Sequence, residues 1–93
     1  RIPYDMPLTR DVLGRIERAE NIVLDMGFST CRVRYHENMA RVELDPAEFY
    51  RMLEAPCRRQ IVQSLRKIGF LHIALDLEGY GQGRMNRSLN NRE

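Results

Sequence analysis

The sequence predicts a small α+β domain in which a three-stranded mixed sheet carries helices on one face, with the element order α-β-β-α-α-β. Some stretches repeat apolar residues every three or four positions, others alternate apolar and polar residues, and glycines separate the two kinds. The chain has 93 residues, of which 43% are hydrophobic and 30% charged, as is usual for one compact domain. We therefore expect a single domain over residues 1–80 and a polar, mobile tail over residues 81–93.

The first helix is expected near residues 10–26. Thr9 is a suitable N-terminal cap, and Gly27 stands where the chain leaves the helix in a left-handed conformation. Glu20 lies within the apolar stripe of this helix, so one carboxylate should face inward and needs an arginine partner or a place at the edge of a cleft. The stripe consists of Val12, Leu13, Ile16, Ala19, Val23 and Leu24.

Two alternating stretches, residues 30–36 and 39–44, predict a hairpin of two antiparallel strands. A loop of two or of four residues, in the same register, would place Val33 opposite Val42. With this register every apolar side chain of the hairpin lies on one face.

The same register gathers arginines on the other face of the hairpin. Arg32 would lie opposite Glu43, and Arg34 opposite Arg41. Like charges directly opposite each other destabilise a sheet by up to about 1 kcal/mol, so this row calls for an anion or for neighbouring carboxylates. Two guanidinium groups two positions apart on one strand can hold phosphate or carboxylate oxygens. The alternative is a solvated sheet face covered by arginine stems, and at this point both interpretations are open.

A short second helix should begin at Pro46, with Asp45 as its cap and Glu48 in the position of a capping-box acid. A third helix should begin at Pro56 and end at Gly69. The core side of this third helix is expected to consist of Ile61, Val62, Leu65 and Ile68.

A last strand is expected over residues 70–77. The tripeptides MGF and IGF each end a helix and lead into a strand. If both turns place their strands alike, the last strand runs parallel to the first, and the first strand of the hairpin is central. The exposed face would then include Asp76 and His72 beside the arginines.

Composition excludes several classes of function. The net charge of +2 and the pI near 8.8 give no reason to expect nucleic acid as a partner. The sequence has no apolar stretch of membrane-spanning length and no signal peptide, so we expect a cytoplasmic protein. Cys31 and Cys57 lie in apolar patterns without metal-ligand spacing, which predicts reduced core thiols and no metal site. Because phosphate-binding glycine loops and Ser-His-Asp groupings are also missing from the sequence, we expect no complete active site in this chain.

Three stretches, RIPYDMPLT, RVRYHENMARVEL and IGFLHIALDLEGYGQGRMN, follow one another within residues 1–86. In this order and spacing they resemble the C-terminal domain of the LarE family, the ATP-dependent sacrificial sulfur transferases. The resemblance implies a longer enzyme whose N-terminal pyrophosphatase-loop (PP-loop) domain uses ATP and Mg to adenylate a carboxylate. A cysteine shortly before the position of Arg1 would then give up its sulfur, or in other members hold an iron–sulfur cluster. The family's product is the thiocarboxylate form of a pyridinium mononucleotide, which becomes a nickel-pincer cofactor.

The resemblance also assigns roles to residues of this chain. It implies that Arg1, Arg32 and Arg34 bind the phosphate or carboxylate of the substrate, and that Glu20 and Glu43 support these arginines. No catalytic residue and no cofactor is implied within the chain, so this part alone would not be an enzyme. The implied partners are its own N-terminal PP-loop domain, the anionic substrate and further copies of the parent in a homo-oligomer.

The chain departs from the family pattern at three positions. Glu37 replaces a glycine of the hairpin and favours the four-residue loop, while Gly81 replaces an arginine and Arg84 a serine. The last two changes leave the identity of the sulfur acceptor open. Two other functions remain as alternatives, a basic RNA-binding module and an oligomerisation domain of an ATP-using enzyme.

Overall fold

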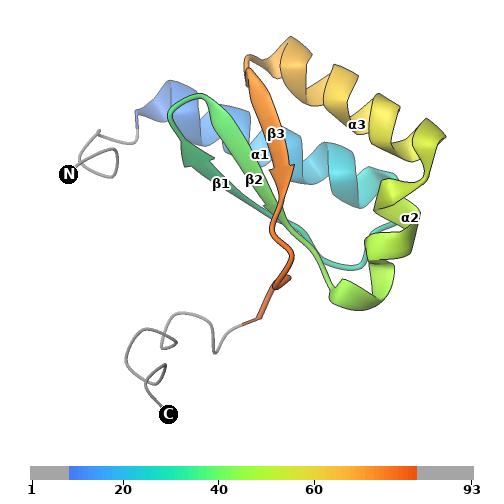
Figure 1. The fold of residues 1–93 in the computed structure, drawn as a ribbon. Helices are drawn as coiled ribbons and strands as arrows, with labels where there is room; N and C mark the ends of the chain where they lie inside the picture. Colours follow the sequence, from blue (N-terminus) through green and yellow to red (C-terminus); the bar gives the residue numbers. More distant parts are fainter. Residues whose placement is uncertain (1–8, 82–93) are drawn as a thin grey trace.

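The computed structural model describes residues 9–81, and the predicted tail and Arg1 lie outside this range, apart from Gly81. Figure 1 shows both long helices on one face of a three-stranded sheet, which confirms the α+β class and the order α-β-β-α-α-β. The elements, in chain order, are α1 (Arg10–Asp25), β1 (Arg32–His36), β2 (Met39–Glu43), the 3₁₀ helix η2 (Pro46–Glu48), α2 (Phe49–Leu53), α3 (Ala55–Ile68) and β3 (His72–Leu75).

The strand order differs from the predicted one. β2 is the central strand, with β1 antiparallel on one side and β3 parallel on the other. β3 is therefore antiparallel to β1, and the prediction of a parallel pair with a central first strand is wrong. Consecutive strands usually lie next to each other, and the crossover through α2 and α3 returns β3 beside β2. The Gly-Phe turns that end α1 and α3 fix how each helix stops but not which strand the next one joins.

The hairpin has the predicted register, with Val33 opposite Val42 and Arg34 opposite Arg41. Its loop is the two-residue alternative, because His36 already pairs with Met39. The two loop residues, Glu37 and Asn38, have φ angles of 49° and 68°. Positive φ at both positions is typical of the type I′ turn, whose twist matches that of the strands. The preference for a four-residue loop is therefore wrong, and Glu37 adopts a backbone conformation that a glycine would adopt more easily.

Helix α1 begins where the sequence predicts. The hydroxyl of Thr9 accepts a hydrogen bond from the backbone N–H of Val12 at 3.1 Å. At the other end of the helix, Arg51 of α2 donates to the carbonyl oxygens of Met26 and Gly27 at 3.0 and 3.1 Å. These contacts satisfy carbonyl groups that a helix end leaves without partners and attach α2 to the end of α1.

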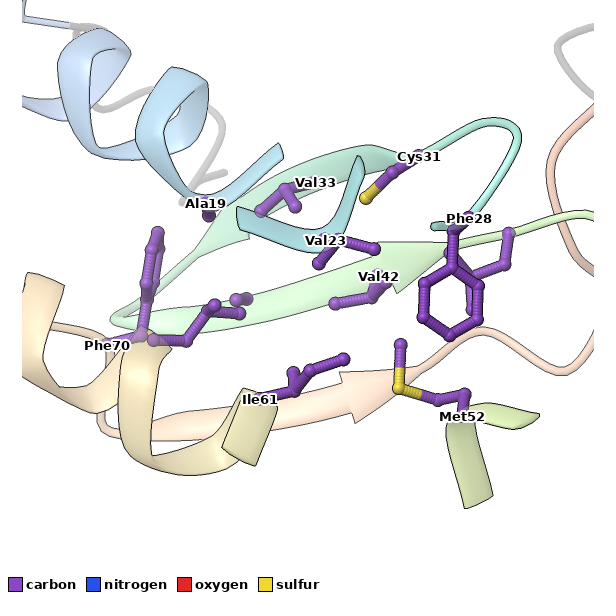
Figure 2. Packing of buried hydrophobic residues seen from close by; sticks show 12 residues of the cluster. Ala19, Val23, Phe28, Cys31, Val33, Val42, Met52, Ile61 and Phe70 are labelled. Atoms are coloured by element: carbon purple, nitrogen blue, oxygen red, sulfur yellow. The ribbon is translucent and has the colours of Figure 1, made fainter. Parts of the chain in front are cut away.

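The core lies between the helices and the sheet. Figure 2 shows Ala19 and Val23 of α1 facing the strands that carry Val33 and Val42. The apolar stripe of α1 is narrower than predicted, since Leu13 and Leu24 remain exposed. The α3 residues that complete the core are Ile61 and Leu65, and Leu44, Met52 and Phe70 close it around the sheet.

Glu48 does not complete a capping box at the start of η2. Its carboxylate accepts hydrogen bonds from the backbone N–H and the hydroxyl of Ser29, at 3.0 and 3.1 Å. Asp45 caps η2 as predicted, through the N–H of Ala47 at 3.0 Å. Within residues 9–81, the helices are too short or too polar to cross a membrane.

Candidate functional site

The face of the sheet opposite the helices carries the predicted row of arginines. Arg32 and Arg34 project from the edge strand β1, and Arg41 from the central strand β2. Their side chains are 47%, 39% and 46% exposed, so all three guanidinium groups are partly open to solvent. Charged heads on alternate positions of the hairpin follow directly from its apolar–polar alternation.

Glu43 resolves the conflict between the two arginines that face each other across the strands. One of its oxygens, Oε2, lies 3.3 Å from Nε of Arg34 and 3.5 Å from Nη2 of Arg41. The Glu43 side chain is only 4% exposed, although it lies on the face away from the helices. A second carboxylate, that of Asp76, lies 3.5 Å from Nε of Arg41. The carboxylates of Glu43 and Asp76 therefore offset the repulsion between the like-charged Arg34 and Arg41.

Glu20 reaches the same row from the helix side. Its Oε2 accepts a hydrogen bond from the backbone N–H of Val33 at 3.0 Å and lies 3.6 Å from Nε of Arg32. Because β1 is an edge strand, some of its N–H groups point away from β2 and need other partners. Glu20 is the partner of one such N–H group, that of Val33, and pairs with Arg32 at the same time. This confirms that the inward carboxylate has an arginine partner.

Four of the five residues assigned to the site from sequence thus lie together. Glu20 pairs with Arg32, Glu43 pairs with Arg34, and Arg32 lies opposite Glu43 in the strand register, while Arg1 lies outside the described residues. Three carboxylates face three guanidinium groups in this cluster when Asp76 and Arg41 are included. Its formal charge is balanced, in agreement with the mild net charge of the chain.

An open groove of about 580 Å³ runs between α1 and β1, beside this cluster. The exposed side chain of Leu13 gives the groove an apolar wall, and Arg32 and Arg34 provide its charged rim. A groove with these two kinds of surface suits a ligand that combines an apolar or aromatic part with an anionic group. The lining residues are Leu13, Ile16, Glu20, Arg32, Val33, Arg34 and Tyr35.

The thiol of Cys31 is not activated as a nucleophile in this structure. Burial, together with the nearby carboxylates of Glu20 and Glu43, raises the pKa of the Cys31 thiol from 9.0 to about 12, against a smaller opposing effect of the neighbouring Arg32. A thiol in this state is not the thiolate that attacks or coordinates. Cys57 is half-buried and reduced. Among the described side chains, no three His, Cys, Asp or Glu residues come together as a metal site.

The sequence did not single out Tyr80, which the structure places at the cluster. The guanidinium carbon of Arg32 lies 6.0 Å from the centre of the Tyr80 ring. Tyr80 lies within the stretch IGFLHIALDLEGYGQGRMN that carries the family resemblance, but neither the resemblance nor the residue pattern assigns it a role. Asp76 could be placed beside the arginines because it continues the alternation of β3.

Comparison with known proteins gives two curated relatives. An uncharacterized protein of Synechocystis sp. and the pyridinium-3,5-bisthiocarboxylic acid mononucleotide synthase of Lactiplantibacillus plantarum are each 38% identical to the chain over 89 residues, or 96% of its length. The chain spans about a third of the length of both relatives, 33% and 32%. No protein-family model matches it. These matches fit a piece from the C-terminal part of a LarE-type protein.

Proposed function

We propose that this chain is the substrate-side, C-terminal domain of a LarE-type sulfur transferase, in which Arg32 and Arg34 hold the anionic groups of the substrate. The proposal is supported by the likeness to the bisthiocarboxylic acid mononucleotide synthase along almost the whole chain. The structural observation that carries it is the pair of half-exposed guanidinium groups, each held by a carboxylate, at the rim of a groove.

The geometry of the pair suits phosphate or carboxylate oxygens. Two positions apart on one strand, Arg32 and Arg34 have Cα atoms about 7 Å from each other and project to the same side. Each guanidinium has five N–H donors, and the ion pairs with Glu20 and Glu43 are through Nε. The terminal nitrogens can therefore donate to an anion while the carboxylates keep the arginine stems in place.

The remaining parts of the reaction belong to the parent protein. In the proposed scheme a PP-loop domain N-terminal to this chain uses ATP and Mg²⁺ to activate a carboxylate of the substrate. A cysteine just before Arg1 then attacks that activated carboxylate through its sulfur and displaces AMP, and loss of its α-proton with cleavage of its Cβ–S bond leaves the sulfur on the substrate and the cysteine as dehydroalanine. Cys31 does not fit the donor role, because its buried thiol stays protonated at neutral pH. This chain would contribute binding and orientation of the substrate, and homo-oligomerisation of the parent is part of the same proposal.

The alternative of RNA binding has less support. Proteins that read single-stranded RNA on a sheet present aromatic rings on which bases stack. Tyr35 of β1 is half-buried instead, with its ring centre 6.2 Å from that of Phe70. The balanced charges around the arginines also suit a small anion better than a polyanionic backbone.

The experiment is a sulfur-transfer assay of the full parent protein with a pyridinium-carboxylate mononucleotide and ATP. We expect Arg32→Gln and Arg34→Gln to fold normally and to lower kcat/KM about 10- to 100-fold, because each removes one charge-assisted contact worth roughly 1.5–3 kcal/mol. Arg59→Gln is the matched control, because Arg59 is an exposed arginine on α3, away from the row. Wild-type activity in both site variants would contradict the proposal.

A further inference from the structure

The segment that follows β3 is fastened to the end of the central strand. The N–H of Asp76 donates to the carbonyl oxygen of Val42 at 2.9 Å, and the N–H of Tyr80 donates to that of Leu44 at 2.8 Å. Between these two points the chain makes a tight turn in which the N–H of Gly79 donates to the carbonyl oxygen of Asp76 at 3.0 Å. Tyr80 therefore has a fixed backbone position.

Gly79 is required for this close passage. It has a φ of +80°, and a Cβ added to it would lie 2.6 Å from Cγ of Pro46 and 2.8 Å from the carbonyl oxygen of Leu44. Both distances are shorter than real Cβ contacts, and one of the atoms is backbone that cannot yield easily. A glycine with positive φ at a close backbone approach indicates a segment that must follow one path.

The path ends at the arginine row. The half-buried ring of Tyr80 lies beside the guanidinium of Arg32, 6.0 Å from ring centre to guanidinium carbon. From α1, the carboxylate of Glu20 lies 3.6 Å from Nε of the same arginine. Two elements far apart in the sequence thus converge on one half-exposed side chain, the Glu20 carboxylate from α1 and the Tyr80 ring from the segment after β3.

We propose that Tyr80 is a positioning residue for Arg32, and that Gly79 and the turn around it serve to bring the Tyr80 ring to that guanidinium. The inference rests on the proposed function in that Arg32 is taken to bind the anionic group of the substrate. A free arginine side chain loses considerable rotamer freedom when it binds an anion. A ring and a carboxylate that already restrict the side chain reduce this loss and aim the guanidinium at the groove.

The first test follows the Arg32 side chain itself by NMR of arginine Nε–Hε groups in the full parent protein. The Arg32 signal is assigned from its loss in Arg32→Lys. We expect the signal to keep its position in Tyr80→Phe, which retains the aromatic face, and to move in Tyr80→Leu, which removes the ring current and keeps apolar bulk. An Arg32 signal that is the same in Tyr80→Leu as in the wild type would overturn the inference.

The second test titrates inorganic phosphate into the same proteins. We expect Tyr80→Leu to raise the Kd for phosphate about two- to fivefold, the equivalent of an exposed cation–π contact, and Tyr80→Phe to leave it unchanged. In an Arg32→Gln background, Tyr80→Leu should add nothing. An unchanged Kd in Tyr80→Leu, or an equal loss in both backgrounds, would overturn the inference, because Tyr80 would then act elsewhere or not at all.

These tests separate the inference from the proposed function. Phosphate affinity and the Arg32 signal are read without ATP, the sulfur donor or the mononucleotide. If they depend on Tyr80 while the parent shows no sulfur transfer, the positioning role stands and the proposed function fails. If sulfur transfer depends on Arg32 but neither readout responds to Tyr80, the function stands and the positioning role fails.

Discussion

Replacing Glu43 with glutamine tests whether the arginine row depends on one buried carboxylate. The variant keeps the size and shape of the side chain and removes only its negative charge. That charge is 3.3 Å from Nε of Arg34 and 3.5 Å from Nη2 of Arg41, and it is almost completely buried. We expect Glu43→Gln to destabilise the fold clearly.

The magnitude follows from the exposure of the three groups. Removing one partner of a fully buried ion pair costs about 3–5 kcal/mol, and exposed pairs contribute about 0–1 kcal/mol. Glu43 is buried but Arg34 and Arg41 are 39% and 46% exposed, so each contact should contribute about 1 kcal/mol. Loss of both contacts, with the two arginines left facing each other, gives about 2 kcal/mol, or a Tm lower by roughly 8–16 °C for a domain of this size.

The assay is urea unfolding of the 93-residue chain at pH 7, followed by far-UV circular dichroism. Glu17→Gln is the control, because Glu17 is an exposed carboxylate on α1 and should change the free energy of unfolding by less than about 0.5 kcal/mol. In a double-mutant cycle, Glu43→Gln and Arg34→Gln should couple by about 1 kcal/mol. A Glu43→Gln chain as stable as the wild type would refute the reasoning, because the carboxylate would then gain no more from the arginines than it loses on burial.

Two further predictions concern the rest of the hairpin region. Because the folded-state pKa of Cys31 is raised from 9.0 to about 12, the unfolded chain releases this proton first, so stability should fall as the pH rises from about 9 toward 12. Urea titrations between pH 8 and 11 should show a smaller decline for Cys31→Ala, and equal declines would argue against the raised pKa. At the hairpin loop, Glu37→Asn should stabilise the chain by about 0.5–1 kcal/mol, because asparagine adopts positive φ more readily than glutamate. A lower unfolding midpoint for Glu37→Asn would show that the Glu37 side chain makes a contact of more value than its backbone strain.

Local pattern was sufficient to predict the hairpin and the positions of the charged residues on it. Strand alternation has a period of two, so one correct pair, Val33 with Val42, determines the face of every other residue in the hairpin. The inward orientation of Glu20 could be predicted in the same way from the helical period, but its partner, Arg32, could not be identified from that period. These features depend on short-range periodicity, which is fully present in the sequence.

Features that depend on contacts between distant segments could not be predicted in this way. Strand order is decided by the path of the α2–α3 crossover, and the turn chemistry of Gly27 and Gly69 contains no information about it. Arg51 is another example, since it donates to the end of α1 and its guanidinium lies 4.4 Å from the centre of the Phe28 ring. The chain has many arginines, and nothing in the sequence distinguishes Arg51 from the others.

The balance of charge in the arginine row has a consequence for how it could bind an anion. Glu43 contacts Arg34 from a buried position, while the guanidinium group is open on the solvent side. An anion that arrives from solvent could therefore bind the open side of the Arg34 guanidinium while Glu43 stays bound on the other side. The carboxylates reduce the positive potential that attracts the anion, which lowers affinity, but they keep the guanidinium planes from turning away before it arrives. Such a site favours a ligand that matches a fixed pair of donors over any ligand that merely carries negative charge, and the proposed function requires this selectivity.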